Sequence, residues 1–214
     1  MRKHSIIIIL GTAHRLRYPG KQSPDGRLHE AIYSRERVKG VAAELRAYGY
    51  HVMTDYEPLD LPTSMQSNSH ATETSRELAM RVATVNKVCQ QEGAANVLYV
   101  SIHVDASGSD GQWHSPNGWS VRVSPKASAE SKLLANCLFD GAKVHGLHMR
   151  QPLATQKYWP QSLKVLNDTA CPAVLTENLF QDNLDDVDFL LSDEGRHVIE
   201  RLHVEGIIKY IESL

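Results

Sequence analysis

One short segment near the start of the chain limits the possible folds more than any other. Residues 6–10 form an unbroken run of branched apolar residues, and the run ends at Gly11. A strand that faces water on one side alternates apolar and polar residues, whereas a continuous apolar run is typical of a strand covered on both faces. The segment therefore predicts a central, parallel strand with helices on each side of its sheet.

The rest of the chain alternates between helix-like and strand-like segments. Apolar residues that recur every three or four positions predict helices at 28–48, 71–91, 129–144, 185–191 and 192–212. Short apolar runs predict strands at 5–10, 50–54, 97–102, 119–123, 163–166 and 173–176, and residues 148–161 have no clear period and are expected to be a long loop. This alternation predicts a single α/β domain with a twisted, largely parallel sheet flanked by helices on both faces.

Composition excludes several classes of protein. The 214 residues carry a formal net charge of −2, without the basic excess of a nucleic-acid-binding protein, so no nucleic-acid partner is expected. The longest apolar run is far shorter than the roughly 18 residues of a membrane span, and it is also too short for a signal peptide. The three cysteines are odd in number and widely spaced, which does not fit a disulfide framework. We therefore expect synthesis in the reducing cytoplasm.

Polar side chains follow three of the predicted strands. His14 comes after the first strand, His103 after the strand at 97–102, and Glu177 after the strand at 173–176. The carboxyl ends of parallel strands meet at one edge of a sheet, and Glu30 begins the helix that returns from this edge. Two histidines and a carboxylate around an open position suit Zn²⁺, and a further carboxylate can act as a general base. The sequence therefore predicts a zinc hydrolase site.

Several stretches spread over nearly the whole chain carry a family resemblance. They are Gly-Arg-Leu-His-Glu at 26–30, Arg-Val-Ala-Thr-Val-Asn at 81–86, Ser-Ile-His-Val-Asp at 101–105, Ser-Lys-Leu-Leu-Ala at 131–135, Pro-Ala-Val-Leu-Thr-Glu-Asn-Leu-Phe-Gln-Asp-Asn at 172–183, Leu-Leu-Ser-Asp-Glu at 190–194 and Glu-Gly-Ile at 205–207. In these stretches the chain resembles the zinc-dependent N-acetylmuramoyl-L-alanine amidases of the type-3 amidase family, which cleave peptidoglycan.

The resemblance implies both a reaction and a site. Residues 1–214 would form a zinc amidase catalytic domain that holds one Zn²⁺ per chain through His14, Glu30 and His103, with Glu177 as the catalytic carboxylate. The expected reaction is hydrolysis of the amide bond between N-acetylmuramic acid and L-alanine in peptidoglycan or a muropeptide. We expect a monomer that acts on the cell wall. Without a recognisable signal peptide, the preferred route is release of a phage or prophage enzyme through a holin; a truncated exported autolysin is the alternative.

The chain departs from the family pattern at two places. The family's first motif, Gly-His-Gly-Gly, is here Gly-Thr-Ala-His-Arg at 11–15, so the loop around the first ligand is expected to take another backbone path. The family glycine after the catalytic carboxylate is Leu179, which we expect to narrow the cleft. Some exported members carry an inhibitory helix after the histidine-bearing strand; residues 104–117 are too short and polar for one, and residues 148–161 are the better lid candidate.

Two other functions stay open at this point. A zinc carboxypeptidase or endopeptidase could use the same metal site, and a clamp for a terminal carboxylate would favour it; Arg15, Arg17 and Arg150 are the candidates. A non-catalytic wall-binding module of the same fold is the second alternative, and retention of Glu177 argues against it.

Other polar and aromatic residues give weaker signals. His145 and His148 form a poor metal candidate because Gly146 between them is expected to end a helix. We expect His29 to be exposed, and His197 and His203 to be exposed or half-buried on the last helix. Four aromatic residues lie in or beside loops and are expected either to line a glycan groove or to pack under the loops: Trp113, Trp119, Tyr158 and Trp159.

Overall fold

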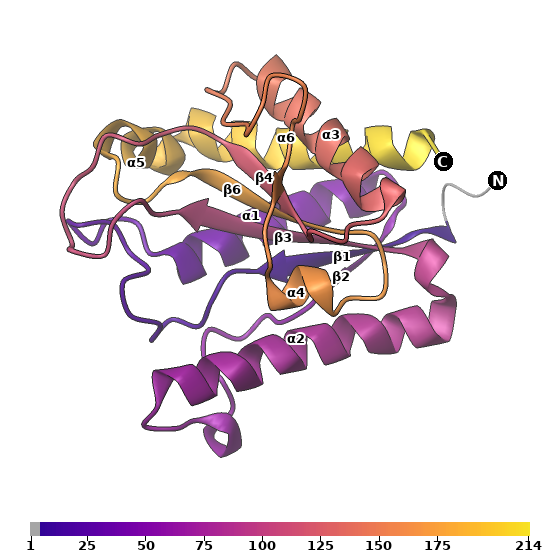
Figure 1. The fold of residues 1–214 in the computed structure, drawn as a ribbon, viewed down its shortest axis with the longest axis horizontal. Helices are drawn as coiled ribbons and strands as arrows, with labels where there is room; N and C mark the ends of the chain where they lie inside the picture. Colours follow the sequence, from indigo (N-terminus) through magenta and orange to yellow (C-terminus); the bar gives the residue numbers. More distant parts are fainter. Residues whose placement is uncertain (1–4) are drawn as a thin grey trace.

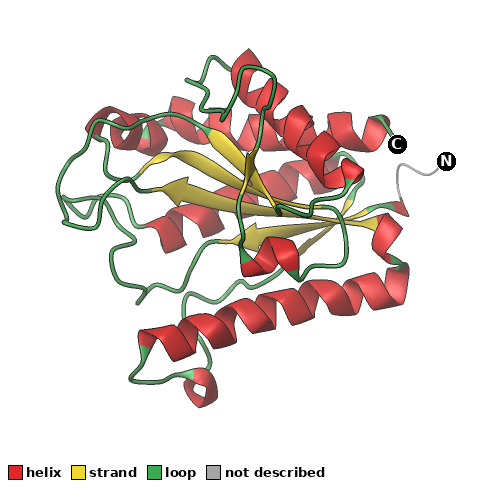
Figure 2. Cartoon of the chain, viewed as in Figure 1, coloured by secondary structure: helices red, strands yellow, loops and turns green. Residues whose placement is uncertain are grey.

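The computed structural model describes residues 5–214 and consists of one six-stranded sheet between two layers of helices (Figures 1 and 2). The strand order is β2-β1-β3-β6-β4-β5. The strands are β1 (Ile7–Thr12), β2 (His51–Thr54), β3 (Val97–Asp105), β4 (Ser120–Val123), β5 (Trp159–Pro160) and β6 (Ala173–Phe180). Neighbouring strands are parallel except for β4 and β6, which are antiparallel. The expected α/β fold is confirmed, with a mixed rather than a wholly parallel sheet.

The helices cover the two faces unequally. One face packs against α1 (Glu30–Ala47), α3 (Ala129–Val144), α5 (Leu184–Leu191) and α6 (Asp193–Glu212). The other face packs against α2 (His70–Glu92) and the single turn α4 (Lys164–Asn167). Two short 3₁₀ turns, Thr63–Met65 and Ala94–Asn96, precede and follow α2. The face with less helical cover carries the polar side chains described below.

Strand β1 explains why the apolar run near the start of the chain is continuous. Ile8 and Leu10 are buried in the core beneath α1, α3 and α6, whereas Ile7 and Ile9 are buried in the core beneath α2. Successive side chains of a strand point to opposite faces, so a strand with both faces covered is apolar throughout. The prediction of a central parallel strand is confirmed.

Three expectations about secondary structure are wrong in detail. Strands β3 and β6 run several residues past the predicted ends, so His103 and Glu177 lie inside strands rather than after them. The strand expected at 163–166 is absent; Lys164–Asn167 form α4, whose Val165 and Leu166 are both buried in one cluster. The loop 148–161 contains the short strand β5. A four-residue apolar run is too short for its period to separate a helix from a strand.

The start of the last helix and the state of the cysteines agree with what the sequence indicates. Ser192 is the N-cap of α6, and its side chain accepts a hydrogen bond from the Gly195 backbone N–H. Cys89, Cys137 and Cys171 are all free and buried. Among the described residues, no helix combines the length and the apolar character that a bilayer crossing requires.

Candidate metal centre

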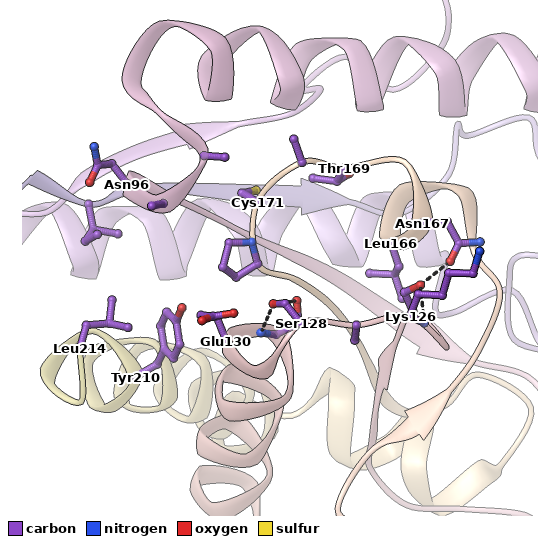
Figure 3. Close-up of a pocket in the computed structure, with 18 of the residues that line it drawn as sticks. Asn96, Lys126, Ser128, Glu130, Leu166, Asn167, Thr169, Cys171, Tyr210 and Leu214 are labelled. Atoms are coloured by element: carbon purple, nitrogen blue, oxygen red, sulfur yellow. Dashed lines mark hydrogen bonds between the residues drawn. The ribbon is translucent and has the colours of Figure 1, made fainter.

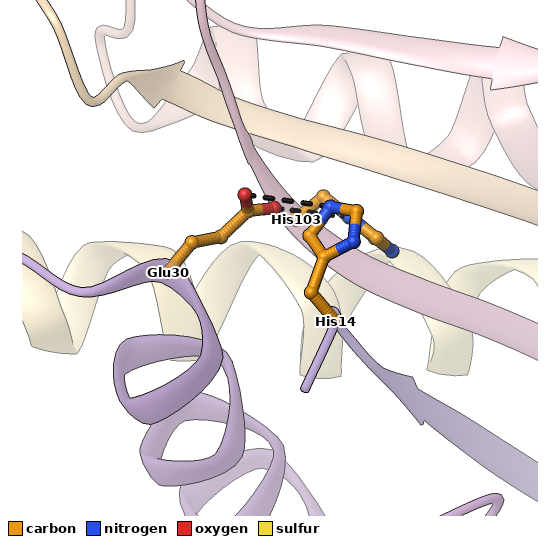
Figure 4. Close-up of side chains that lie close together, drawn as sticks. All are labelled: His14, Glu30 and His103. Atoms are coloured by element: carbon orange, nitrogen blue, oxygen red, sulfur yellow. Dashed lines mark hydrogen bonds and ion pairs between the residues drawn. The ribbon is translucent and has the colours of Figure 1, made fainter. Parts of the chain in front are cut away.

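Three side chains from distant parts of the chain meet at the carboxyl ends of β1 and β3. His14, Glu30 and His103 each offer one ligand atom, and these atoms all lie within 4.8 Å of one another (Figure 4). His14 follows β1, Glu30 is the first residue of α1, and His103 lies in β3. Two imidazoles and one carboxylate form a mixed N/O donor set of the kind found in catalytic zinc sites.

The Glu30 carboxylate lies at the centre of this cluster and is fully buried. Its Oε1 is 3.1 Å from His103 Nδ1 and accepts a hydrogen bond from the Val104 backbone N–H at 3.2 Å. Its Oε2 is buried without a hydrogen bond, at 3.5 Å from both His14 Nε2 and Lys21 Nζ. A buried carboxylate oxygen without a hydrogen bond is costly, and a cation bound between these side chains would satisfy it.

The ionisation of the cluster also suits a cation. Burial lowers the pKa of His14 to about 3, so its imidazole is neutral, which is the form that binds metals. Burial alone would raise the pKa of Glu30, but His14, His103 and Lys21 together hold it well below its usual range. The site therefore offers a charged carboxylate beside a neutral ring at physiological pH.

The orientation of His103 is set by its neighbour on the same strand. His103 Nε2 is 3.0 Å from Ser101 Oγ, and the two residues point to the same face of β3 because they are two positions apart. This contact directs Nδ1 toward Glu30. A hydrogen-bond partner on the second ring nitrogen is the usual way in which proteins orient a ligating histidine.

The loop that carries His14 has an unusual backbone conformation. His14 itself has a φ of 30°, in the left-handed region that a residue with a side chain seldom adopts. Side chains of α1 hold the loop in place. Ser34 Oγ accepts a hydrogen bond from the Ala13 backbone N–H at 2.8 Å, and the Arg35 guanidinium donates to the carbonyls of Ala13 and His14.

A buried network of charged side chains attaches the same loop to α2. Arg81 donates to both oxygens of Asp55, at 2.9 and 2.8 Å, and to Glu77 Oε1 at 3.0 Å. Arg15, the residue after His14, is 1% exposed and pairs with Glu77 and Glu73. Arg15 is therefore not available to bind a terminal carboxylate of a substrate, so it is excluded as one of the three clamp candidates. Nothing in the sequence singled out this network, although the motif at 81–86 begins with one of its members, Arg81.

Glu177 faces the cluster from the neighbouring strand. It is in register with His103 of β3 on one side and with Ser120 of β4 on the other, so all three side chains point to the face that carries α2 and α4. Glu177 and the three clustered residues line one cavity of about 360 Å³. Burial, with Asp105 and Glu30 nearby, raises the pKa of Glu177 well above its ordinary value.

Leu179 occupies a strained position next to Glu177. Between the pairs His103–Glu177 and Asp105–Phe180 the register of β3 and β6 shifts by one residue, which is a β-bulge in β6. Leu179 has a φ of 65° there, a left-handed conformation that favours glycine. Its side chain is buried in the core beneath α1, α3 and α6, on the opposite face from Glu177, so the expected narrowing of the cleft is wrong.

Four other histidines and one tryptophan singled out from the sequence lie outside this cavity. His145 pairs with Glu205 at 2.9 Å, and His148 contacts Asn117, so the two do not form a joint metal site. His29 is half-buried rather than exposed, and His203 is fully buried rather than near the surface. Of the four aromatic residues, Trp119 is fully buried and its indole N–H donates to Asn178, which excludes it from a glycan groove.

A larger cavity of about 1230 Å³ lies at the opposite end of the sheet (Figure 3). It is bordered by the start of α3, the end of α6 and the segment before β6, with Ser128, Tyr210 and Cys171 among its lining residues. None of its described lining residues is a histidine. Of the two cavities, the smaller one contains the cluster of His14, Glu30 and His103.

Several known proteins resemble this chain in sequence or in fold. The endolysin of Bacillus phage SPP1 is 28% identical over 127 residues, which are 59% of this chain and 45% of the endolysin, so the match spans just under half of that relative. The structure of the CwlD amidase from Clostridioides difficile in complex with the GerS lipoprotein has a TM-score of 0.78 at 18% identity, with 98% of this chain and 100% of that chain covered. The N-acetylmuramyl-L-alanine amidase from Mycobacterium smegmatis gives 0.76 at 19% identity, with 98% of each chain covered. At identities this low, the two structural matches support the fold alone. The model of one family matches residues 8–209, and the chain accordingly belongs to the N-acetylmuramoyl-L-alanine amidase family.

Proposed function

We propose that this protein is a zinc-dependent amidase that hydrolyses the bond between N-acetylmuramic acid and L-alanine in peptidoglycan. The observation that carries the proposal is the cluster of His14, Glu30 and His103, with ligand atoms within 4.8 Å of one another, in a chain of the amidase family. The match to a phage endolysin supports the cell wall as the place of action and phage or prophage release as the route.

The residues present fit a zinc ion. They supply two imidazole nitrogens and one carboxylate, and the unsatisfied Glu30 Oε2 is the kind of buried atom that a bound cation would pair with. The three side chains would hold the ion and leave a position open. When bound, zinc supplies a Lewis acid that activates water and polarises the amide carbonyl.

Glu177 is the proposed proton carrier. It lines the same cavity as the ligand cluster and stands beside His103 across the β3–β6 ladder, but it is not one of the three clustered residues. In its ionised form, which a cation bound by the neighbouring cluster would favour, Glu177 takes a proton from the attacking water and passes it to the nitrogen of the leaving L-alanine, which departs as an amine. Such transfer by a positioned side chain contributes roughly 10²- to 10⁴-fold to the rate.

Digestion of a defined muropeptide, followed by mass spectrometry, tests the proposal. We expect two products, the intact sugar and a stem peptide with a new N-terminal alanine. Other new amines would indicate a peptidase, and unchanged muropeptide would indicate a binding module; either result would contradict the proposal. Dialysis against a chelator should abolish the activity, and zinc should restore it.

A pair of histidine variants separates metal binding from general effects. His103→Ala should lose both zinc and activity because it removes one of the clustered donors. His197→Ala is the matched control, since His197 is exposed on α6 and lies outside the cavity. A His103→Ala protein that retains zinc at the level of the control would overturn the ligand assignment.

A further inference from the structure

Lys21 lies beside the ligand cluster because the chain folds back on itself between β1 and α1. Gln22 and His29 form an antiparallel bridge, and the Ser23 backbone N–H donates to the Leu28 carbonyl at 2.8 Å. The Glu30 backbone N–H donates in turn to the Lys21 carbonyl at 3.0 Å. Residues 21–30 therefore form a closed loop whose two ends are neighbours, and this loop places Lys21 next to Glu30.

A second contact attaches this loop to the strand that carries Glu177. The Gln181 side-chain amide donates to the Gly20 carbonyl at 2.8 Å, just before Lys21. Gln181 is buried and follows β6 directly. Lys21 is thus held from both sides, by the start of α1 and by the end of β6. Its backbone position does not depend on the conformation of an open loop.

Lys21 is also the basic side chain of the cavity with the weakest partner. Three basic residues line the cavity, and two of them are engaged: Arg81 is bound by Asp55 and Glu77, and Lys164 pairs with Asp168 at 2.6 Å. Lys21 Nζ is 3.5 Å from Glu30 Oε2, which is longer than an N–H···O hydrogen bond. A cation bound by Glu30 would occupy this carboxylate and leave the ammonium donors of Lys21 to another acceptor.

We propose that Lys21 is a catalytic residue that donates a hydrogen bond to the carbonyl oxygen of the scissile amide. Water attack on the amide carbon moves the carbonyl electron pair onto that oxygen, and a fixed ammonium group stabilises the negative charge that develops there. A donor of this kind acts mainly on the transition state, so it raises kcat more than it lowers KM. This inference rests on the proposed amidase function.

The alternative is that Lys21 only supports Glu30, and zinc affinity distinguishes the two roles. A lysine that acts on the substrate repels the metal ion electrostatically, so its neutral replacement leaves zinc affinity equal or higher. A lysine that positions Glu30 as a ligand would instead lower zinc affinity when it is replaced. Zinc affinity is measured by competition with a chromophoric chelator and needs no substrate.

The experiment compares Lys21→Met, Lys21→Arg and, as a matched control, Lys39→Met on the exposed side of α1. We expect Lys21→Met to lower kcat on the muropeptide by roughly 10²- to 10³-fold, with KM changed only a few-fold and zinc affinity not reduced. Lys21→Arg should recover part of kcat because it keeps the charge, and Lys39→Met should match the wild type.

Two results would overturn the inference while leaving the proposed function intact. One is a Lys21→Met protein whose kcat at saturating zinc is within twofold of the wild type. The other is a tenfold or greater loss of zinc affinity in Lys21→Met together with a kcat that recovers when zinc is saturating. A wild-type protein that cleaves no muropeptide would contradict the proposed function itself, and this inference with it.

Discussion

Replacement of Arg81 by methionine should destabilise the protein strongly, because Arg81 joins three parts of the structure. Its guanidinium extends from α2, binds Asp55 after β2 through two hydrogen bonds of 2.9 and 2.8 Å, and also binds Glu77. A further bond of 3.0 Å reaches Thr12 Oγ1 at the end of β1. Arg81, Asp55 and Glu77 are all buried. Methionine has a similar length but no donor, so the variant leaves two carboxylates buried with fewer partners.

The size of the effect follows from this arrangement. Removal of one partner from a buried ion pair costs about 3–5 kcal/mol, because the remaining charge stays buried without compensation. For a domain of 150–250 residues, each kcal/mol lowers the thermal midpoint by roughly 2–4 °C. The expected decrease in Tm is therefore about 6–20 °C. Arg81→Lys should recover little of it, since one ammonium group cannot reproduce the planar, two-sided contacts with Asp55 and Glu77.

Chemical and thermal unfolding of the metal-free proteins, followed by circular dichroism, measures this loss. The matched control is Arg76→Met on the same helix, because Arg76 is exposed and donates only to the backbone carbonyls of Met65 and Gln66. The control should remain within about 0.5 kcal/mol of the wild type. An Arg81→Met protein as stable as the control would refute the view that this network holds the His14 loop against α2.

Three further predictions concern catalysis, pH and regulation. Glu177→Ala should lower the rate of muropeptide cleavage by roughly 10²- to 10⁴-fold, while its zinc content, measured by elemental analysis, stays normal. Glu30→Ala should lose both zinc and activity. Equal zinc loss in the two variants would contradict the assignment of Glu30 as a ligand and Glu177 as the proton carrier. Burial lowers the pKa of His203 from 6.5 to about 4. Between these two pH values the unfolded chain binds a proton at His203 that the folded chain does not. The free energy of unfolding should therefore fall by on the order of 3 kcal/mol as the pH decreases from 6.5 to 4. Urea titrations at pH 7 and 5 check this, and a His203→Gln protein with the same pH dependence as the wild type would speak against it. Residues 106–119, all of them described, contain no helix between β3 and β4. We therefore predict that the purified chain is active alone, and a requirement for an added partner protein would disprove this.

The three residues of the candidate metal centre could be found from sequence because their positions follow from topology. His14 and His103 lie at the ends of neighbouring parallel strands, and Glu30 starts the helix that leaves the same edge. These relations need only the order of strands and helices, which the apolar periodicity supplies. The family resemblance then assigned roles to the same residues independently.

The partners of these residues could not be found in the same way. Arg81 and Asp55 are 26 positions apart, and Arg81 and Glu77 read as an ordinary i, i+4 pair on a solvated helix face. Their burial depends on how α2 packs against the sheet, which periodicity does not give. The antiparallel direction of β4 is also a tertiary result, because a four-residue strand carries no signal of its orientation.

The position of β6 in the sheet has a consequence for the order in which the protein becomes functional. All three clustered residues are present once residue 105 has been synthesised, but Glu177 arrives only with β6, which inserts between β3 and β4. Until then β3 is an open edge strand, and unpaired edges of this kind are prone to intermolecular pairing. A nascent chain that ends before β6 therefore contains the three clustered residues but not Glu177, the proposed proton carrier. Insertion of β6 covers that edge and brings in Glu177 at the same time, so the edge is protected from intermolecular pairing when the proposed proton carrier reaches the site.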